Sequence, residues 1–183
     1  MDLLTTIGSR RTIHKYIDKK VEEKIIKEAL MAANLAPCHR LTFPWRFTGI
    51  KNKTRIKMAK YFAKNKLSDS DYNNSELRNL HEKKFLEPSH LIIASQVLSK
   101  DERTRKEDYA ACSCAINNIC LYLASKEVGS KWSTGSLITD DFIYELADIE
   151  KHLEEIIGFI WIGYGKTPKG IKRLEINEFF KER

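Results

Sequence analysis

The sequence has 183 residues, of which 42% are hydrophobic and 31% are charged, and its formal net charge at pH 7 is +7. This composition is too apolar for a disordered chain and suits a single globular domain over residues 1–183. The four cysteines form no CxxC pair and are not accompanied by paired histidines, which argues against a metal site and favours reduced thiols in a cytoplasmic protein.

The N-terminal part is predicted to form a helix and then a short strand. No basic segment precedes an apolar core near the N-terminus, and every apolar run is far shorter than a bilayer span, so we expect neither export nor membrane insertion. Residues 21–35 repeat apolar side chains at helical spacing and are followed by Pro37, which predicts an amphipathic helix. The stretch WRFTGI, residues 45–50, has the aromatic and β-branched content of a strand.

Residues 51–88 are polar and helix-prone, and they predict two surface helices with a mobile connection near LSDSDYNN. The densest basic run of the chain lies here, and helical spacing would place most of its side chains on a solvated face. Contact with phosphate groups, a membrane surface or nucleic acid is the alternative. The run consists of Lys51, Lys53, Arg55, Lys57, Lys60, Lys64 and Lys66.

The C-terminal part alternates between buried elements and polar connections. The apolar runs at 90–98 and 155–165 predict two central strands. Residues 109–126 are apolar almost all round the helical wheel, which predicts a helix buried on every side, and the same helix of a second subunit could supply part of the cover. Gly129 is the expected C-terminal stop of this helix, and a polar helix is expected near 139–154.

The predicted order is helix, strand, helices, strand, long helix, strand, helix, strand. Such elements pack most naturally as a sheet with helices on both faces. The tail KTPKGIKRLEINEFF is basic first and apolar last, so we expect it to cross a surface and dock. No repeat, low-complexity tract or linker interrupts the chain, which supports a single domain.

Three short motifs combine side chains that suit an anionic ligand. Arg10 and Arg11 precede Thr12, and two guanidinium groups beside a hydroxyl group are well suited to phosphate. The stretch WSTG offers hydroxyl and backbone donors, and a basic pair follows near the C-terminus. Each motif alone is better explained by solvated surface residues. Because the sequence has no Walker-type loop and no GxGxxG after a strand, a nucleotide would be held by scattered side chains.

Four stretches together resemble the nitroreductase family of flavin enzymes. They are SRRTIHKY near the N-terminus, AANLAPCHRLTFPWRF after the first helix, AINNICLYLASKEVGSKWSTG in the long helix and its exit, and IIGFIWIGYGKTPKGIKR near the C-terminus. They occur in the order found in the family and span nearly the whole chain. The sequence is most similar to the small, minimal branch of the family.

The resemblance implies an α+β fold: a three-layer α/β/α sandwich with a mainly antiparallel central sheet, in a domain-intertwined homodimer with one FMN in each of two interface pockets. Arg10, Arg11 and Thr12 match the segment that holds the FMN phosphate and ribityl chain, and His14 matches a position directed at the flavin pyrimidine. A loop that crosses the dimer is matched by Leu35, Pro37 and His39. A turn near the isoalloxazine is matched by Trp132, Ser133, Thr134 and Gly135. A basic pair that closes on the phosphate is matched by Lys172 and Arg173.

The implied function is that of an FMN-dependent NAD(P)H oxidoreductase. Hydride passes from NADH or NADPH through flavin N5 to a nitroaromatic, quinone or activated-alkene acceptor in a ping-pong cycle, and no catalytic acid or base is nominated. Histidine at position 14 makes the flavin contact titratable. Two alternatives are a flavin-binding or flavin-modifying dimer without reductase turnover and a basic nucleic-acid-binding protein. From the residues alone, His39 could cap a turn and Trp132 could belong to the core.

Overall fold

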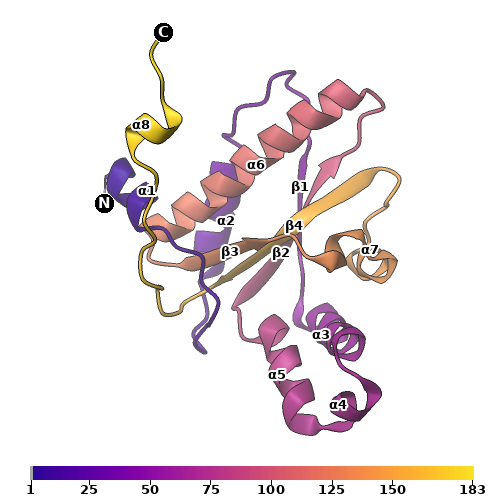
Figure 1. Ribbon diagram of the computed structural model, residues 1–183. Helices are drawn as coiled ribbons and strands as arrows, with labels where there is room; N and C mark the ends of the chain where they lie inside the picture. The colour runs from indigo at the N-terminus through magenta and orange to yellow at the C-terminus, as the bar shows by residue number, and fades with distance from the viewer. Residues whose placement is uncertain (1) are drawn as a thin grey trace.

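The structure is a computed structural model that describes residues 2–183 as an α+β fold, drawn in Figure 1. One to three helices precede each strand along the chain, and a long tail follows the last strand. The elements in chain order are α1 (Leu3–Ser9), α2 (Glu23–Ala33), β1 (Trp45–Gly49), α3 (Asn52–Lys66), α4 (Asp69–Asn73), α5 (Ser75–Leu86), β2 (His90–Val97), α6 (Glu102–Ser125), β3 (Gly129–Ser133), η1 (Ser136–Thr139), α7 (Asp141–Ala147), β4 (Glu154–Gly163) and α8 (Ile176–Phe179).

The strands form one four-stranded antiparallel sheet in the order β1-β2-β4-β3. β2 and β4 lie in the middle and share the longest ladder. The strands predicted at 45–50, 90–98 and 155–165 are confirmed, and so is the mainly antiparallel character of the sheet. β1 and β3 are edge strands, so each has one side that no other strand of the sheet covers.

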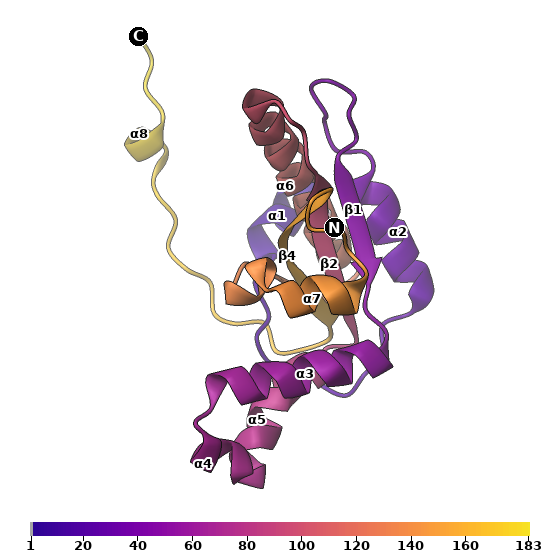
Figure 2. The same ribbon diagram turned by 90° about the vertical axis from the view of Figure 1, so that its right-hand side faces the viewer.

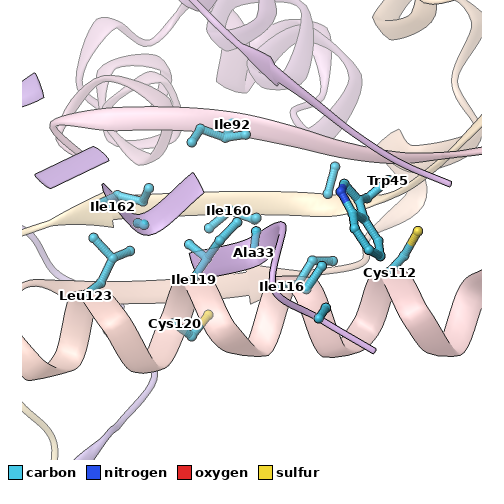
Figure 3. Close-up of a cluster of buried hydrophobic side chains, with 14 of the residues drawn as sticks. Ala33, Trp45, Ile92, Cys112, Ile116, Ile119, Cys120, Leu123, Ile160 and Ile162 are labelled. Atoms are coloured by element: carbon cyan, nitrogen blue, oxygen red, sulfur yellow. The ribbon is translucent and has the colours of Figure 1, made fainter. Parts of the chain in front are cut away.

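Side chains of the two central strands alternate between two hydrophobic clusters, one on each face of the sheet. Ile92 and Ile160 face the cluster that contains α2 and α6, part of which is shown in Figure 3. Ile93 and Phe159, each one position away, belong to the second cluster, which includes residues of α3, α5 and α7. Both faces are therefore buried, which explains why these strands are apolar throughout.

The long helix α6 contributes much of the cover over the first face. It begins at Glu102, earlier than the predicted 109–126, because the Asp101 carboxylate accepts a 2.8 Å hydrogen bond from the backbone N–H of Thr104 and caps the helix. On its buried side, burial raises the pKa of the Cys112 thiol to about 12. This cysteine therefore acts as a small apolar side chain.

One chain alone does not bury α6 on every side, and burial of the remaining side by a second subunit stays a prediction. Ala110, Cys114 and Asn117 are exposed, and Leu121 is only partly buried. These residues are three or four positions apart, so they lie along one stripe of the helix. Covering this stripe requires a surface that the single chain does not provide.

Two helices also end at residues other than those predicted. α6 ends before Glu127, which takes a left-handed conformation with φ of 58°, so Gly129 is the first residue of β3 and not the helix stop. A Cβ at Gly129 would lie 2.4 Å from Cγ1 of Ile13, so packing against the N-terminal segment requires glycine. α7 is shorter than the predicted 139–154 because Asp148 ends it in a left-handed conformation with φ of 56°.

The two helices predicted within 51–88 are confirmed as α3 and α5. The connection between them forms the short helix α4, with Ser68 and Asn74 capping α4 and α5. The lysines of the basic run are exposed as predicted, but Arg55 is only 4% exposed. Its guanidinium donates to the backbone oxygen of Phe85 over 2.6 Å, so it ties α3 to α5 and is not a surface charge.

The C-terminal tail leaves the body of the chain. Residues 166–183 are exposed along their length, and α8 lies apart from the sheet in Figures 1 and 2. Even the apolar side chains of Ile176 and Phe179 are 69% and 68% exposed. The predicted docking of the tail is therefore not met within one chain. The three-layer sandwich and the intertwined homodimer remain predictions.

Gly158 in β4 has a φ of 157°, and a Cβ there would lie 2.1 Å from Nε1 of Trp132. We expect Gly158→Ala to destabilise the fold by about 2–3 kcal/mol, because the indole must move and the backbone is strained. Gly49→Ala is the control, since nothing lies within 4 Å of that position, and it should change stability by less than about 0.5 kcal/mol. Urea unfolding measures both variants, and equal losses would contradict the packing argument.

Candidate functional site

The N-terminal segment after α1 runs along the outer side of β3. Thr12 forms an isolated parallel bridge with Ser130, and the backbone N–H of Ile13 donates to the Ser130 carbonyl oxygen over 3.1 Å. Further along, the N–H of Ile17 donates to the carbonyl oxygen of Tyr164 over 2.9 Å. These bonds hold the segment that carries the first predicted site residues against one edge of the sheet.

Arg10 and Arg11 form the basic end of this segment, and both line two cavities of about 320 and 380 Å³. Nη1 of Arg11 donates to the carbonyl oxygens of Gly8 and Arg10 over 2.6 and 2.8 Å, while its Nε is buried without a partner among residues 2–183. Arg173 reaches the larger cavity from the tail, whereas Lys172 lines neither. A buried guanidinium N–H without a partner favours an anionic ligand.

A cavity of about 500 Å³ lies at the other end of the segment, and we call it the aromatic cavity. Its volume is in the range typical of small-molecule sites. Rings from α3, α5 and β4 line it: Phe62, Phe85, Phe159 and Trp161. Predicted site residues from the N-terminal segment and from the end of β3 also line it, so the structure brings them together: His14, Ser133, Thr134 and Gly135.

β3 and β4 form the floor of the aromatic cavity. Lys131 pairs with Trp161 and Ser133 pairs with Phe159, so these side chains share one face of the sheet. The indole N–H of Trp161 donates to Oγ of Ser133 over 2.8 Å, and Nζ of Lys131 lies 5.8 Å from the Trp161 ring centroid. Burial, and to a lesser extent the charge of Lys84, lowers the pKa of Lys131. The floor thus combines flat rings with a cation and a hydroxyl group.

Trp132 lies on the opposite face of β3 from the aromatic cavity. It stands between Lys131 and Ser133, and its side chain packs against the cluster under α6. Its indole N–H donates to the carbonyl oxygen of Ile157 over 3.2 Å. These surroundings favour a core role for Trp132.

The predicted residues in the loop between α2 and β1 are exposed: Leu35, Pro37 and His39. Their loop is tied to the start of α6, because Nε of Arg40 donates to Glu107 over 3.0 Å and Oγ1 of Thr42 donates to Asp108 over 2.6 Å. Leu121, which lines the larger basic cavity, lies far along the same helix. At ~1.5 Å per residue, the rise from Asp108 to Leu121 is about 20 Å. One chain therefore keeps this loop away from the arginines.

Three lysines that line the aromatic cavity were not among the predicted site residues, although Lys66 belongs to the basic run described above: Lys66, Lys84 and Lys131. The first two belong to polar helices, where their pattern is that of any solvated lysine. The sequence did give a weak indication of the aromatic floor. Phe159 and Trp161 are two positions apart in a predicted strand, so their rings must lie on the same face of the sheet.

Within residues 2–183, no helix combines the length and apolar character needed to cross a membrane. The same part of the chain has no group of three His, Cys, Asp or Glu side chains placed to hold a metal ion.

YfhC of Bacillus subtilis (strain 168), which is named as an NAD(P)H nitroreductase, is 31% identical over 179 residues, which are 96% of this chain and 91% of that protein. A nitroreductase-like protein from Bacillus cereus has a similar structure, with a TM-score of 0.85 and 24% identity over 100% of this chain and 96% of that one.

A protein from Desulfovibrio desulfuricans, described as a nitroreductase in complex with FMN, has a TM-score of 0.78 and 18% identity over 100% of this chain and 97% of that one. The model of the Nitroreductase family matches residues 7–164, which is most of the chain. On this match and the similarity to YfhC, the chain belongs to the nitroreductase family.

Proposed function

We propose that this protein is an FMN-dependent NAD(P)H oxidoreductase with a single FMN-binding domain. The observation that carries the proposal is the anchored segment from Arg10 to His14, which joins a basic end to the aromatic cavity. Bound FMN supplies hydride transfer between NADH or NADPH and an acceptor of the nitroaromatic, quinone or activated-alkene class. The similarity to one protein named as an NAD(P)H nitroreductase, and to another that holds FMN, supports this proposal.

The basic end suits the phosphate of FMN. Arg10 and Arg11 would form charge-assisted hydrogen bonds with it, and the unpartnered Nε of Arg11 would gain an acceptor. Thr12 would contact the ribityl chain, while the tail would bring Lys172 and Arg173 over the phosphate. From residue 10 to residue 14 an extended chain spans at most about 14 Å, which suits a ligand with a phosphate at one end and a ring system at the other.

The aromatic cavity suits the flat ring system of FMN. We place His14 at the pyrimidine edge, where it would stabilise negative charge, and the turn from Ser133 to Gly135 beside the ring, where hydroxyl and backbone groups can donate. Trp132 would support this turn from the other face of β3. The aromatic walls would exclude water. None of these residues is assigned a role as a catalytic acid or base.

We also propose an intertwined homodimer with a three-layer α/β/α arrangement. The exposed stripe of α6 gives a second copy a surface to cover. If two α6 helices packed antiparallel about a two-fold axis, the loop at the start of one helix would lie beside the arginines near the end of the other. Leu35, Pro37 and His39 of the second copy would then complete the site, which one chain cannot do.

The tail would provide a second link between the subunits. A groove of about 850 Å³ runs between α2, the edge strand β1 and the start of α3, with Ile26, Leu30 and Phe47 among its lining residues. The exposed apolar side chains of the tail have the character needed to fill such a groove in a second copy. We place the protein in the cytoplasm, where its buried cysteines would stay reduced.

Purified protein should be yellow, and Arg10→Ala should weaken FMN binding roughly tenfold to a hundredfold, because a charged hydrogen bond to phosphate is lost. Arg103→Ala is the control, since Arg103 is exposed and its partner Glu107 also pairs with Arg40. Fluorescence titration of the apoprotein with FMN measures both. Protein that binds no FMN and oxidises no NAD(P)H would contradict the proposed function, whereas FMN without turnover would favour a flavin-binding dimer.

His14→Ala should retain FMN but lower its reduction potential. In a two-electron couple, the potential falls by about 30 mV for each tenfold loss in the protein's preference for reduced over oxidised FMN. Spectroelectrochemical titration measures the potential, with His152→Ala, an exposed histidine outside the cavities, as control. A loss of FMN equal to that of Arg10→Ala would show that the two roles are assigned wrongly.

Combined Ile176→Ser and Phe179→Ser changes should reduce the mass in solution from twice 21.3 kDa towards 21.3 kDa and release FMN. Both side chains are exposed in one chain, so their loss should not unfold a monomer. Light scattering coupled to gel filtration measures the mass, and Lys181→Ser serves as the control. An unchanged dimer at the lowest measurable concentration would contradict the role of the tail.

A further inference from the structure

The aromatic cavity gathers basic side chains from four separate parts of the chain, and three of them are lysines. Its basic lining residues come from the N-terminal segment, α3, α5 and β3: His14, Lys66, Lys84 and Lys131. The acidic lining is a single residue, Glu87, and none of the three lysines forms an ion pair within residues 2–183. Like charges around one cavity repel each other, so an anion bound among them is stabilised.

The rings of the cavity form one continuous aromatic wall. The Phe62 and Phe85 centroids are 5.2 Å apart, those of Phe85 and Trp161 are 5.0 Å apart, and Phe159 stacks on Trp161 at 6.0 Å. Nζ of Lys84 lies 5.9 Å from the Phe62 centroid, so cation and rings share the same surface. A wall of this kind suits a flat ring that bears an anionic group.

We propose that the aromatic cavity selects electron acceptors that carry a carboxylate or sulfonate group beside a flat ring, and that Lys66 is a residue that recognises this charge. The inference rests on the proposed function and names the class of acceptor for the same site. Phe62 and Lys66 are four residues apart on α3, so both lie on the side of the helix that faces the cavity. Lys66 is exposed, which places its charge at the mouth and away from the floor where Lys131 lies.

Lys64 provides a matched control on the same helix. It lies two residues from Lys66, so it points to a different side of α3, and it is also exposed but does not line the cavity. Both lysines lie in the last turn of α3. Loss of either charge therefore has the same effect on the helix and on net charge, and only Lys66 should affect the ligand.

The experiment compares the FMN-loaded enzyme with two acceptors, 1,4-naphthoquinone and its 2-sulfonate, each of which takes two electrons from NADH and two protons to give the hydroquinone. The ratio of kcat/KM for the sulfonate to kcat/KM for the neutral quinone should fall roughly three- to tenfold in Lys66→Gln and further in Lys66→Glu. Lys64→Gln should leave the ratio unchanged. In the wild type, added salt should lower the ratio.

An unchanged ratio in both Lys66 variants, or an equal fall in Lys64→Gln, would overturn the inference while the proposed function stands. A fall in kcat/KM for both quinones alike would also overturn it, because the charge would then serve the flavin. The assay is repeated with NADPH in place of NADH. If the Lys66 variants change only the ratio of the activities with NADPH and NADH, the charge of Lys66 recognises the hydride donor, and its role in recognising the acceptor is overturned. Absence of FMN and of turnover with either quinone would instead overturn the proposed function.

Discussion

The length of α6 is the constraint on which the proposed site depends. One end of this helix holds the loop that carries His39, through hydrogen bonds to Glu107 and Asp108, and the region near its other end faces Arg10 and Arg11. Because the helix is hydrogen-bonded along its length and packed on the sheet, the two groups cannot approach within one chain. A second copy that packs against the exposed stripe of α6 would unite them, so dimerisation and cofactor binding are coupled in this account.

The proposed site also depends on the close approach of the N-terminal segment to β3. Gly129 leaves room for Ile13, and the backbone hydrogen bond from Ile13 to Ser130 then fixes the position of the segment. On the neighbouring strand, Gly158 leaves room for the indole of Trp132. Two glycines without side chains thus allow the packing that sets the distance between the basic end and the aromatic cavity, although neither would touch a ligand.

The buried strands and the long helix could be predicted because their apolar patterns follow directly from burial on one or both faces. The resemblance to a family supplied His14 and the turn from Ser133, which the structure brings to one cavity. Lys84 could not be predicted in this way, since only tertiary packing distinguishes a lysine at a cavity from a solvated one. The burial of Arg55 could not be predicted for the same reason. The basic run suggests that Arg55 is exposed, but the structure buries it between α3 and α5.

The most direct test of a site shared between two chains is complementation in mixed dimers. Arg10→Ala and His39→Glu each alter one half of the proposed site, so neither homodimer should bind FMN tightly. When the two variants are mixed and their subunits exchange, each mixed dimer should regain one intact site and bind one FMN with wild-type affinity. FMN titration of the mixture that shows no affinity beyond that of the separate variants would contradict the account.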